Sequence, residues 1–172
     1  MTNEIIGQAI GILATIITFV SYQMNTKKSL LAVQTCATIC TCLAYLFLGA
    51  ASGFALNIVC VTRNVVFYFT KKGTKLNYIA TACLTLAMVI LGAISWQGYV
   101  SLLIIVALAL NTVFMSLGSP QLLRKSVLFT STLVLIYNCF VFSIGGITNE
   151  GVSIASSVIG IIRFYKGKEE KI

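Results

Sequence analysis

Long apolar stretches separated by short basic clusters are the main pattern along this chain. The clusters are Lys27–Lys28, then Lys71, Lys72 and Lys75, then Arg124–Lys125, and finally Arg163, Lys166, Lys168 and Lys171. A helix needs about 20 apolar residues to cross a bilayer. The stretch before the first cluster has room for one such helix, and the later intervals 29–70, 76–123 and 126–162 each have room for two. The pattern therefore predicts seven membrane-spanning helices.

Each interval with room for two helices contains a turn signal near its middle. These signals are Ala50–Gly53, Trp96–Gly98 and Ser143–Gly146, and the Trp side chain suits a membrane interface. We predict helices at 5–22, 30–49, 53–70, 76–95, 99–117, 126–143 and 147–165. The predicted fold class is thus an all-α polytopic membrane protein, with little chain left for a soluble domain.

Composition supports the membrane class and excludes several others. Of the 172 residues, 58% are hydrophobic and 9% are charged, whereas an average soluble domain carries about 25% charge. The net charge of +8 does not indicate nucleic-acid binding, because the basic residues form small clusters rather than one face. The chain has no His and no carboxylate pair within a span, so we expect neither an enzyme nor a metal or cofactor site. The six Cys are interpreted as small packing residues.

All four basic clusters are expected on one side of the membrane, because each pair of helices starts and ends at a cluster. The positive-inside rule places that side in the cytoplasm, so the N-terminus is outside and the C-terminus inside. The start Met1–Glu4 lacks the basic region of a signal peptide, and we expect no cleaved leader. Besides anchoring the topology, the clusters have a second interpretation as sites for lipid headgroups.

The chain also contains a candidate internal repeat at an offset of 92 residues. Comparing 29–57 with 121–149 gives seven identities in 29 positions, among them Tyr45 with Tyr137 and Asn57 with Asn149. We therefore predict a first three-helix repeat at 1–72, a linker helix at 73–97 and a second three-helix repeat at 98–172. Parallel repeats of this kind, related by an axis along the membrane normal, occur in transporters with substrate sites at the repeat interface.

Motifs near the C-terminus carry a resemblance to a known family. Ser143–Gly146 is followed by Glu150–Gly151 and then by Ile161–Phe164. In this spacing, and in length and hydropathy, the chain resembles the YgjV-type bacterial inner membrane protein family. The resemblance implies a multi-pass protein of the bacterial inner (plasma) membrane more than it implies an activity.

Two further segments carry a more distant resemblance. Ser21–Gln23 followed by Lys27–Ser29 is similar to a PQ-loop with Tyr in place of Pro, and Pro120–Gln121 followed by Lys125–Ser126 is its displaced counterpart. The chain in this respect resembles the SWEET, PQ-loop and PnuC superfamily of small-solute transporters. That resemblance implies a plan of three helices, one linker helix and three helices, with the N-terminus outside. The chain has no Pro within its first or fifth predicted span, where that superfamily places its hinges.

Polar side chains interrupt the third and seventh predicted spans. Such groups are costly in a bilayer and usually face the bundle interior or a cavity. Asn57 and Asn64 are seven residues apart and so share one face of the helix at 53–70. Further polar residues recur at helical spacing along 147–165. The predicted substrate-binding residues are Asn57, Arg63, Asn64, Asn111, Asn149, Ser153 and Ser156.

Each of these residues has an alternative role. Asn, Ser and Gly also join helices by close packing and interhelical hydrogen bonds. Arg63 precedes Lys71 by eight residues, so its side chain could snorkel to the cytoplasmic interface. Tyr45, Tyr137 and Glu150 are candidate gating residues. The tyrosines are equally suited to anchoring at the interface. Glu150 suits either a solvated helix start favoured by the helix dipole or a cation-attracting or proton-linked group at the outer mouth.

These features favour a transporter or facilitator that passes a small polar solute through a central cavity between the third and seventh helices. Asn amides offer both donors and acceptors, which suits an uncharged solute, whereas Arg63 would favour a carboxylate or phosphate. The alternative is a non-transporting membrane receptor, scaffold or assembly partner with the same fold. The expected partners are the lipid bilayer and the solute; nucleic acid is not expected, and a homodimer is left open.

Overall fold

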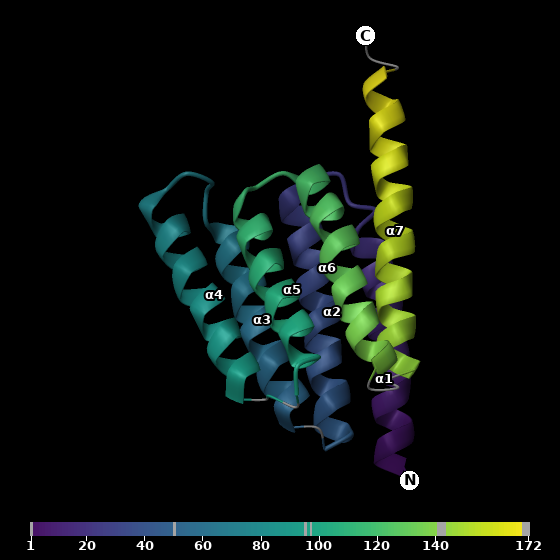
Figure 1. Ribbon diagram of the computed structural model, residues 1–172. Coiled ribbons are helices and arrows are strands. Elements are labelled where there is room, and N and C mark those ends of the chain that lie inside the picture. Colours follow the sequence, from purple (N-terminus) through teal and green to yellow (C-terminus); the bar gives the residue numbers. More distant parts are fainter. Residues whose placement is uncertain (1, 50, 95, 97, 141–143, 170–172) are drawn as a thin grey trace.

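In the part of the chain that the structure describes, seven helices run back and forth along one direction, joined by short connections (Figure 1). The computed structural model describes residues 2–49, 51–94, 96, 98–140 and 144–169. The helices are α1 (Thr2–Ser21), α2 (Lys27–Phe47), α3 (Ala51–Phe69), α4 (Lys75–Ile94), α5 (Ser101–Ser116), α6 (Pro120–Phe140) and α7 (Ile144–Glu169). The predicted all-helical class is confirmed, and each helix overlaps one predicted span.

The helix ends follow the turn chemistry of the sequence. Thr26 caps α2, because its Oγ1 accepts a hydrogen bond from the backbone N–H of Ser29 at 3.1 Å. Gly49 follows the other end of α2 with φ of +70°, a conformation that glycine adopts without strain. The start of α6 differs from expectation: the helix begins at Pro120 rather than at 126. Proline fits the first turn of a helix, where its missing N–H would have no intrahelical partner.

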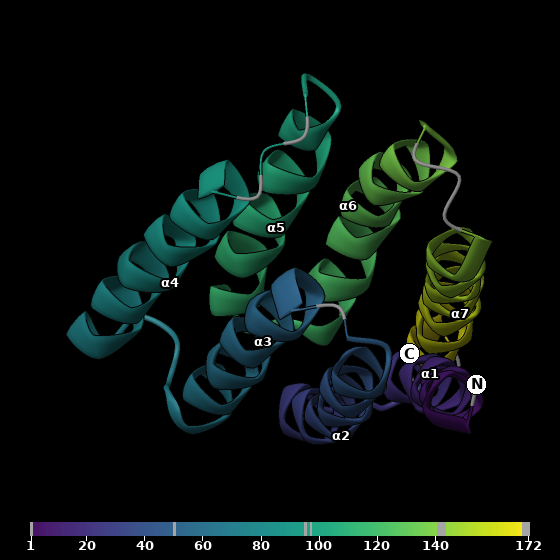
Figure 2. The same cartoon turned by 90° about the horizontal axis from the view of Figure 1, so that it is seen from below.

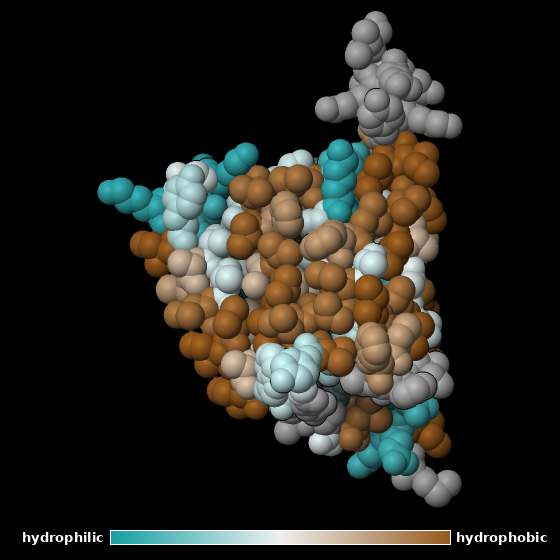
Figure 3. All heavy atoms as spheres, viewed as in Figure 1, coloured by the Kyte–Doolittle hydropathy of each residue, from teal (hydrophilic) through white to brown (hydrophobic). Residues whose placement is uncertain are grey.

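The outer surface of the bundle suits a lipid environment. By length and composition, three of the described helical segments can cross a membrane: Asn3–Ser21, Lys27–Phe47 and Lys75–Ile94. Phe54–Phe69 and Ser101–Ser116 are apolar but shorter. Large apolar side chains such as Ile12, Phe129 and Ile94 are exposed, and Figure 3 shows a broad hydrophobic belt on the viewed face. That all seven helices cross the membrane, with the N-terminus outside, stays a prediction.

The helices pack mainly on their neighbours in the chain. α2 lies between α1 and α3, α6 lies between α5 and α7, and α4 packs on α5 and more loosely on α3. The helices α1, α2 and α3 thus form one row, and α5, α6 and α7 form a second. Contacts of α1 with α7 and of α3 with α5 join the two rows, as the end-on view of Figure 2 shows. The rows consist of the helices assigned to the two predicted repeats. The symmetry between them, and the boundaries 1–72, 73–97 and 98–172, stay predictions.

The main core lies among α2, α3, α5 and α6. It is formed by Tyr22, Leu30, Leu31, Phe67, Met115, Leu123 and Val127. Leu31 and Leu123, which the 92-residue offset pairs, are both fully buried. The connections α1–α2, α3–α4 and α5–α6 and the C-terminal end of α7 lie together at one end of the bundle (Figure 1). The first three basic clusters flank these connections, so they share that end.

Candidate functional site

A buried arginine and its neighbouring asparagine are the centre of a first polar group. Arg63 on α3 is 3% exposed and Asn64 is fully buried. Nε and Nη2 of Arg63 donate hydrogen bonds to Oδ1 of Asn64 at 3.3 and 3.2 Å, and Nη1 donates to Oγ1 of Thr112 on α5 at 3.5 Å. Nδ2 of Asn64 donates to Oγ1 of Thr38 on α2 at 3.5 Å. The group therefore ties α3 to both α2 and α5.

The guanidinium of Arg63 lies inside the bundle and does not snorkel to the interface. Its hydrogen-bond partners in the described part of the chain are neutral oxygens, with no carboxylate within ion-pair distance. A buried charge that lacks an opposite charge is destabilising, because the interior solvates it less well than water does. An ionisable residue held in this way inside a membrane protein is a functional-site candidate.

A second polar group surrounds Glu150, near the start of α7. Its carboxylate accepts hydrogen bonds from the Ser131 hydroxyl on α6 and, at 3.4 Å, from Nδ2 of Asn149. Oδ1 of Asn149 in turn accepts a hydrogen bond from Oγ1 of Thr15 on α1 at 3.4 Å. Asn149 and Glu150 are both half-buried. This group ties α7 to α6 and α1.

Ser153 and Ser156, further along α7, are both buried. Oγ of Ser156 donates to the backbone oxygen of Phe19 at 2.6 Å. Nε2 of Gln23, in the α1–α2 connection, donates to Oγ and to the backbone oxygen of Ser156, both at 2.9 Å. Ser156 thus makes a direct contact between α7 and the C-terminal end of α1.

Arg124 is buried at the same junction, although the sequence analysis treated it only as part of a basic anchor. It is 1% exposed. Its Nε donates to the backbone oxygen of Tyr22 at 2.7 Å, and its Nη2 donates to the backbone oxygen of Met24. Its guanidinium carbon lies 4.4 Å from the ring centroid of Phe164 on α7. Arg124 therefore satisfies carbonyl groups at the end of α1, where the helix dipole also favours a positive charge.

The other predicted residues lie on four different helices. Asn57 on α3 and Asn111 on α5 are half-buried, as are Tyr45 on α2 and Tyr137 on α6. The charge of Glu150 acts on the Tyr45 hydroxyl, which relates two of the candidate gating residues. Their gating role stays a prediction.

Several buried polar oxygens have no hydrogen-bond partner among the described residues. They include Oε1 of Gln34 on α2, Oδ1 of Asn111 on α5 and Oγ of Ser157 on α7. Nε2 of Gln34 donates to the Tyr22 hydroxyl at 3.4 Å. Both Arg63 and Glu150 act electrostatically on that hydroxyl.

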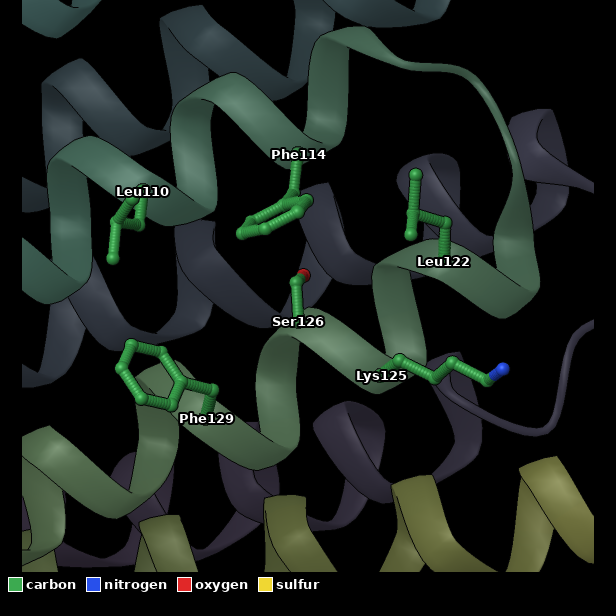
Figure 4. Close-up of a pocket in the computed structure, with 6 residues that line it drawn as sticks. All are labelled: Leu110, Phe114, Leu122, Lys125, Ser126 and Phe129. Atoms are coloured by element: carbon green, nitrogen blue, oxygen red, sulfur yellow. The ribbon is translucent and has the colours of Figure 1, made fainter.

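The predicted residues are thus divided between two groups with different helix neighbours. α3 packs on α2, α4 and α5, whereas α7 packs on α6 and α1. That Asn57 and Asn64 line one cavity with Asn149 and Ser156 stays a prediction. An open hollow of about 340 Å³ lies elsewhere, between α5 and α6 (Figure 4). Its lining is mostly apolar and consists of Leu110, Phe114, Leu122, Lys125, Ser126 and Phe129.

The two groups can form hydrogen bonds with a ligand and can attract a ligand of opposite charge. They supply amides, hydroxyls, one guanidinium and one carboxylate. All six cysteines are free thiols. Among the described residues, no cluster of three or more His, Cys, Asp or Glu could hold a metal ion.

Sequence reasoning missed five residues that complete these groups. They are Thr15, Gln23, Thr38, Thr112 and Ser131. A Thr in a membrane helix can satisfy its own hydroxyl, as Thr112 does by donating to the backbone oxygen of Leu108 at 2.8 Å, so its presence alone marks no site. Two of the five carried a signal: the 92-residue offset pairs Thr38 with Thr130, and Gln23 belongs to the segment that is similar to a PQ-loop.

Comparison with known proteins adds a family to this geometry. The Imp-YgjV family model, described as bacterial inner membrane protein, matches residues 5–168. The match covers both polar groups and confirms the resemblance inferred from the C-terminal motifs. No curated protein and no solved structure matches the chain.

Proposed function

The chain belongs to the Imp-YgjV family of bacterial inner membrane proteins and is a multi-pass helical protein of that membrane; from this premise we propose that it binds a small polar solute inside its helix bundle and moves it across the membrane. The observation that carries the proposal is the set of buried polar oxygens without a hydrogen-bond partner among the described residues; besides those on α2, α5 and α7, the set extends to α4 and α6. Ordered water or a polar solute would supply the missing partners.

An unpartnered oxygen is destabilising in a membrane protein, because lipid offers it no hydrogen bond. Leu at position 34 or 111 would avoid that penalty while occupying similar space. We therefore propose that the unpartnered oxygens of Gln34 and Asn111 accept hydrogen bonds from a ligand. Spare hydrogen-bonding capacity on several helices also suits a solute that must be released again.

The Arg63 group adds a place where such a solute can bind. Its three hydrogen bonds are 3.2 to 3.5 Å long, at or beyond the upper end of the usual range for N–H donors. A solute oxygen could replace Thr112 or Asn64 as acceptor with little loss. Hydroxyl- and amide-bearing solutes fit the neutral groups, and a carboxylate or phosphate would in addition neutralise Arg63. The proposed passage lies between the rows α1–α3 and α5–α7, which we propose to be parallel repeats.

Flux through purified protein in liposomes tests this proposal. Osmotic swelling is followed by light scattering with four solutes of similar size: a polyol, an amide, a carboxylate and a phosphate. Asn111→Leu should lower the flux of the transported solute by about tenfold or more, equivalent to about 1.4 kcal/mol. The same change should leave thermal stability equal or higher, because it removes an unpartnered oxygen.

The matched control is Thr62→Val, at an exposed position on α3. It should change neither flux nor stability. If Asn111→Leu leaves the flux per folded protein unchanged, or if the wild-type protein passes none of the four solutes, the proposal is wrong.

A second candidate function, a non-transporting receptor, scaffold or assembly partner, is favoured by one specific observation. Ser156 and Arg124 make direct, short contacts with the end of α1, so this junction is firmly joined. A protein without flux for any solute, but with a binding partner that protects it from unfolding, would support this candidate instead.

A further inference from the structure

Of the four acidic residues in the sequence, only Glu150 lies away from its ends. The other three acids lie at the ends of the sequence, at positions 4, 169 and 170. Six residues separate Glu150 from the start of α7 at Ile144, which places it about 9 Å along the helix at 1.5 Å per residue. Its carboxyl group therefore lies nearly two helical turns in from the α6–α7 connection.

The surroundings of the Glu150 carboxylate are polar but uncharged. Its hydrogen-bond donors are the Ser131 hydroxyl and Nδ2 of Asn149. No ion pair joins it to a Lys or Arg among the residues that the structure describes. The guanidinium of Arg63 is instead held by Asn64 and Thr112. Neutral donors stabilise a carboxylate only in part, so a proton is the simplest species that can remove its charge.

A hydroxyl group from α6 and an amide group from α7 contact this carboxyl, and a hydroxyl group from α1 contacts that amide. α6 contributes Ser131, and α1 contributes Thr15 through Asn149. The titratable groups on which the charge of Glu150 acts are Tyr45 on α2 and Tyr22 in the α1–α2 connection, and Arg63 acts on the same Tyr22 hydroxyl.

We propose that Glu150 binds and releases a proton during each transport cycle, so that movement of the solute is coupled to the charge state of this carboxyl. The inference rests on the proposed transport function. A proton from water on the side of the α6–α7 connection binds a carboxylate oxygen, and it leaves to water on the other side. The net change is one proton transferred with the solute, with no bond formed or broken beyond that O–H bond.

Labelling with dicyclohexylcarbodiimide tests the proton site directly. This apolar reagent adds to a protonated carboxyl in a lipid-like environment, and mass spectrometry of the purified full-length protein locates the adduct. We expect an adduct on Glu150 at acidic pH, falling about tenfold for each pH unit above the midpoint. Glu150→Gln should abolish it. Glu4, an exposed carboxyl in the first turn of α1, is the internal control and should remain unlabelled.

Two further measurements separate this proposal from a structural role and from a metal cation. Ser131→Ala leaves the carboxyl in place but removes a donor to its charged form, so labelling should persist to higher pH. Sodium binds oxygen ligands such as these and is compared with potassium at equal concentration. Suppression of the adduct by sodium alone would assign the site to Na⁺ and overturn the proton. An adduct that does not depend on pH, or no adduct at any pH, would also overturn it.

Coupling is measured as solute flux in liposomes with and without an imposed pH gradient. The gradient should change wild-type flux by about tenfold, equivalent to about 1.4 kcal/mol, and should have no effect on Glu150→Gln. If the two proteins respond equally, the coupling is wrong while the transport function stands. If the wild-type protein shows pH-dependent labelling but passes no solute, the transport function and its coupling fail and only the proton site remains.

Discussion

Nε of Arg124 donates a 2.7 Å hydrogen bond to the backbone oxygen of Tyr22, a residue 102 positions earlier in the chain. Nη2 of the same side chain donates to the backbone oxygen of Met24, so one guanidinium serves two carbonyl groups of the α1–α2 connection. Gly160 on α7 completes the junction, because an ideal Cβ there would lie 2.7 Å from that Tyr22 oxygen. The junction joins the first helix of the chain to its last two.

Replacement of Arg124 should destabilise the protein. Arg124→Ala leaves two carbonyl groups without their donor, and hydrogen bonds from a charged group contribute about 1.5–3 kcal/mol each, so we expect a loss of about 3 kcal/mol or more. Arg124→Lys should recover little, because an ammonium group cannot reproduce the planar fork. Thermal unfolding in detergent measures both. The adjacent and exposed Lys125→Ala is the control and should have little effect.

Two glycines of α7 should respond to alanine with opposite signs. At Gly160 the new Cβ would lie 2.7 Å from the Tyr22 backbone oxygen and 2.8 Å from Nε of Arg124, so Gly160→Ala should force α7 away and destabilise the protein. At Gly151 nothing lies within 4 Å, so Gly151→Ala should stabilise the helix by up to about 1 kcal/mol. Melting curves of the two variants in the same detergent decide this. Equal effects would contradict the close packing of α1 against α7.

The pair formed by Arg63 and Asn64 predicts a charge-dependent result. Asn64→Leu removes the acceptor of two Arg63 donors and should cost about 3 kcal/mol, as expected when a buried charge loses its partner. Asn64→Asp provides a carboxylate at the same place and should retain most of the stability. Denaturation followed by the fluorescence of Trp96 compares the variants. If Asn64→Leu is as stable as the wild type, the guanidinium of Arg63 has another partner.

The side of the membrane that holds the basic end can be tested by cysteine labelling. Tyr99, 93% exposed in the α4–α5 connection, and Lys72 in the α3–α4 connection lie at opposite ends of the bundle (Figure 1). With the native cysteines replaced by serine, a membrane-impermeant maleimide added to intact spheroplasts should label Tyr99→Cys and leave Lys72→Cys unlabelled. The reverse pattern would invert the predicted orientation, and labelling of both in intact cells would contradict a single membrane crossing between them.

The sequence by itself determined the class of the protein and the extent of its helices. In a lipid environment every backbone polar group must find a partner within its own segment, so a long apolar run between polar breaks has one regular structure available. α2, found at Lys27–Phe47 and expected at 30–49, shows how closely such local rules locate a helix. α6 was misplaced at its start because Arg124 and Lys125 were taken as the end of a connection. Pro120 was the local signal for the true start.

The tertiary structure alone decided what the polar side chains do. Whether Arg63 snorkels or enters the bundle depends on the rotation of α3 about its axis, which is set by packing against α2 and α5. Its partner Thr112 lies 49 residues away, and the partner of Arg124 lies 102 residues away. Hydrophobic periodicity reports which face of a helix is apolar, but not which helix it meets or at what depth. The polar contacts of Arg63, Glu150 and Arg124 arise from those meetings, because a hydrogen bond requires its two atoms within about 3.5 Å.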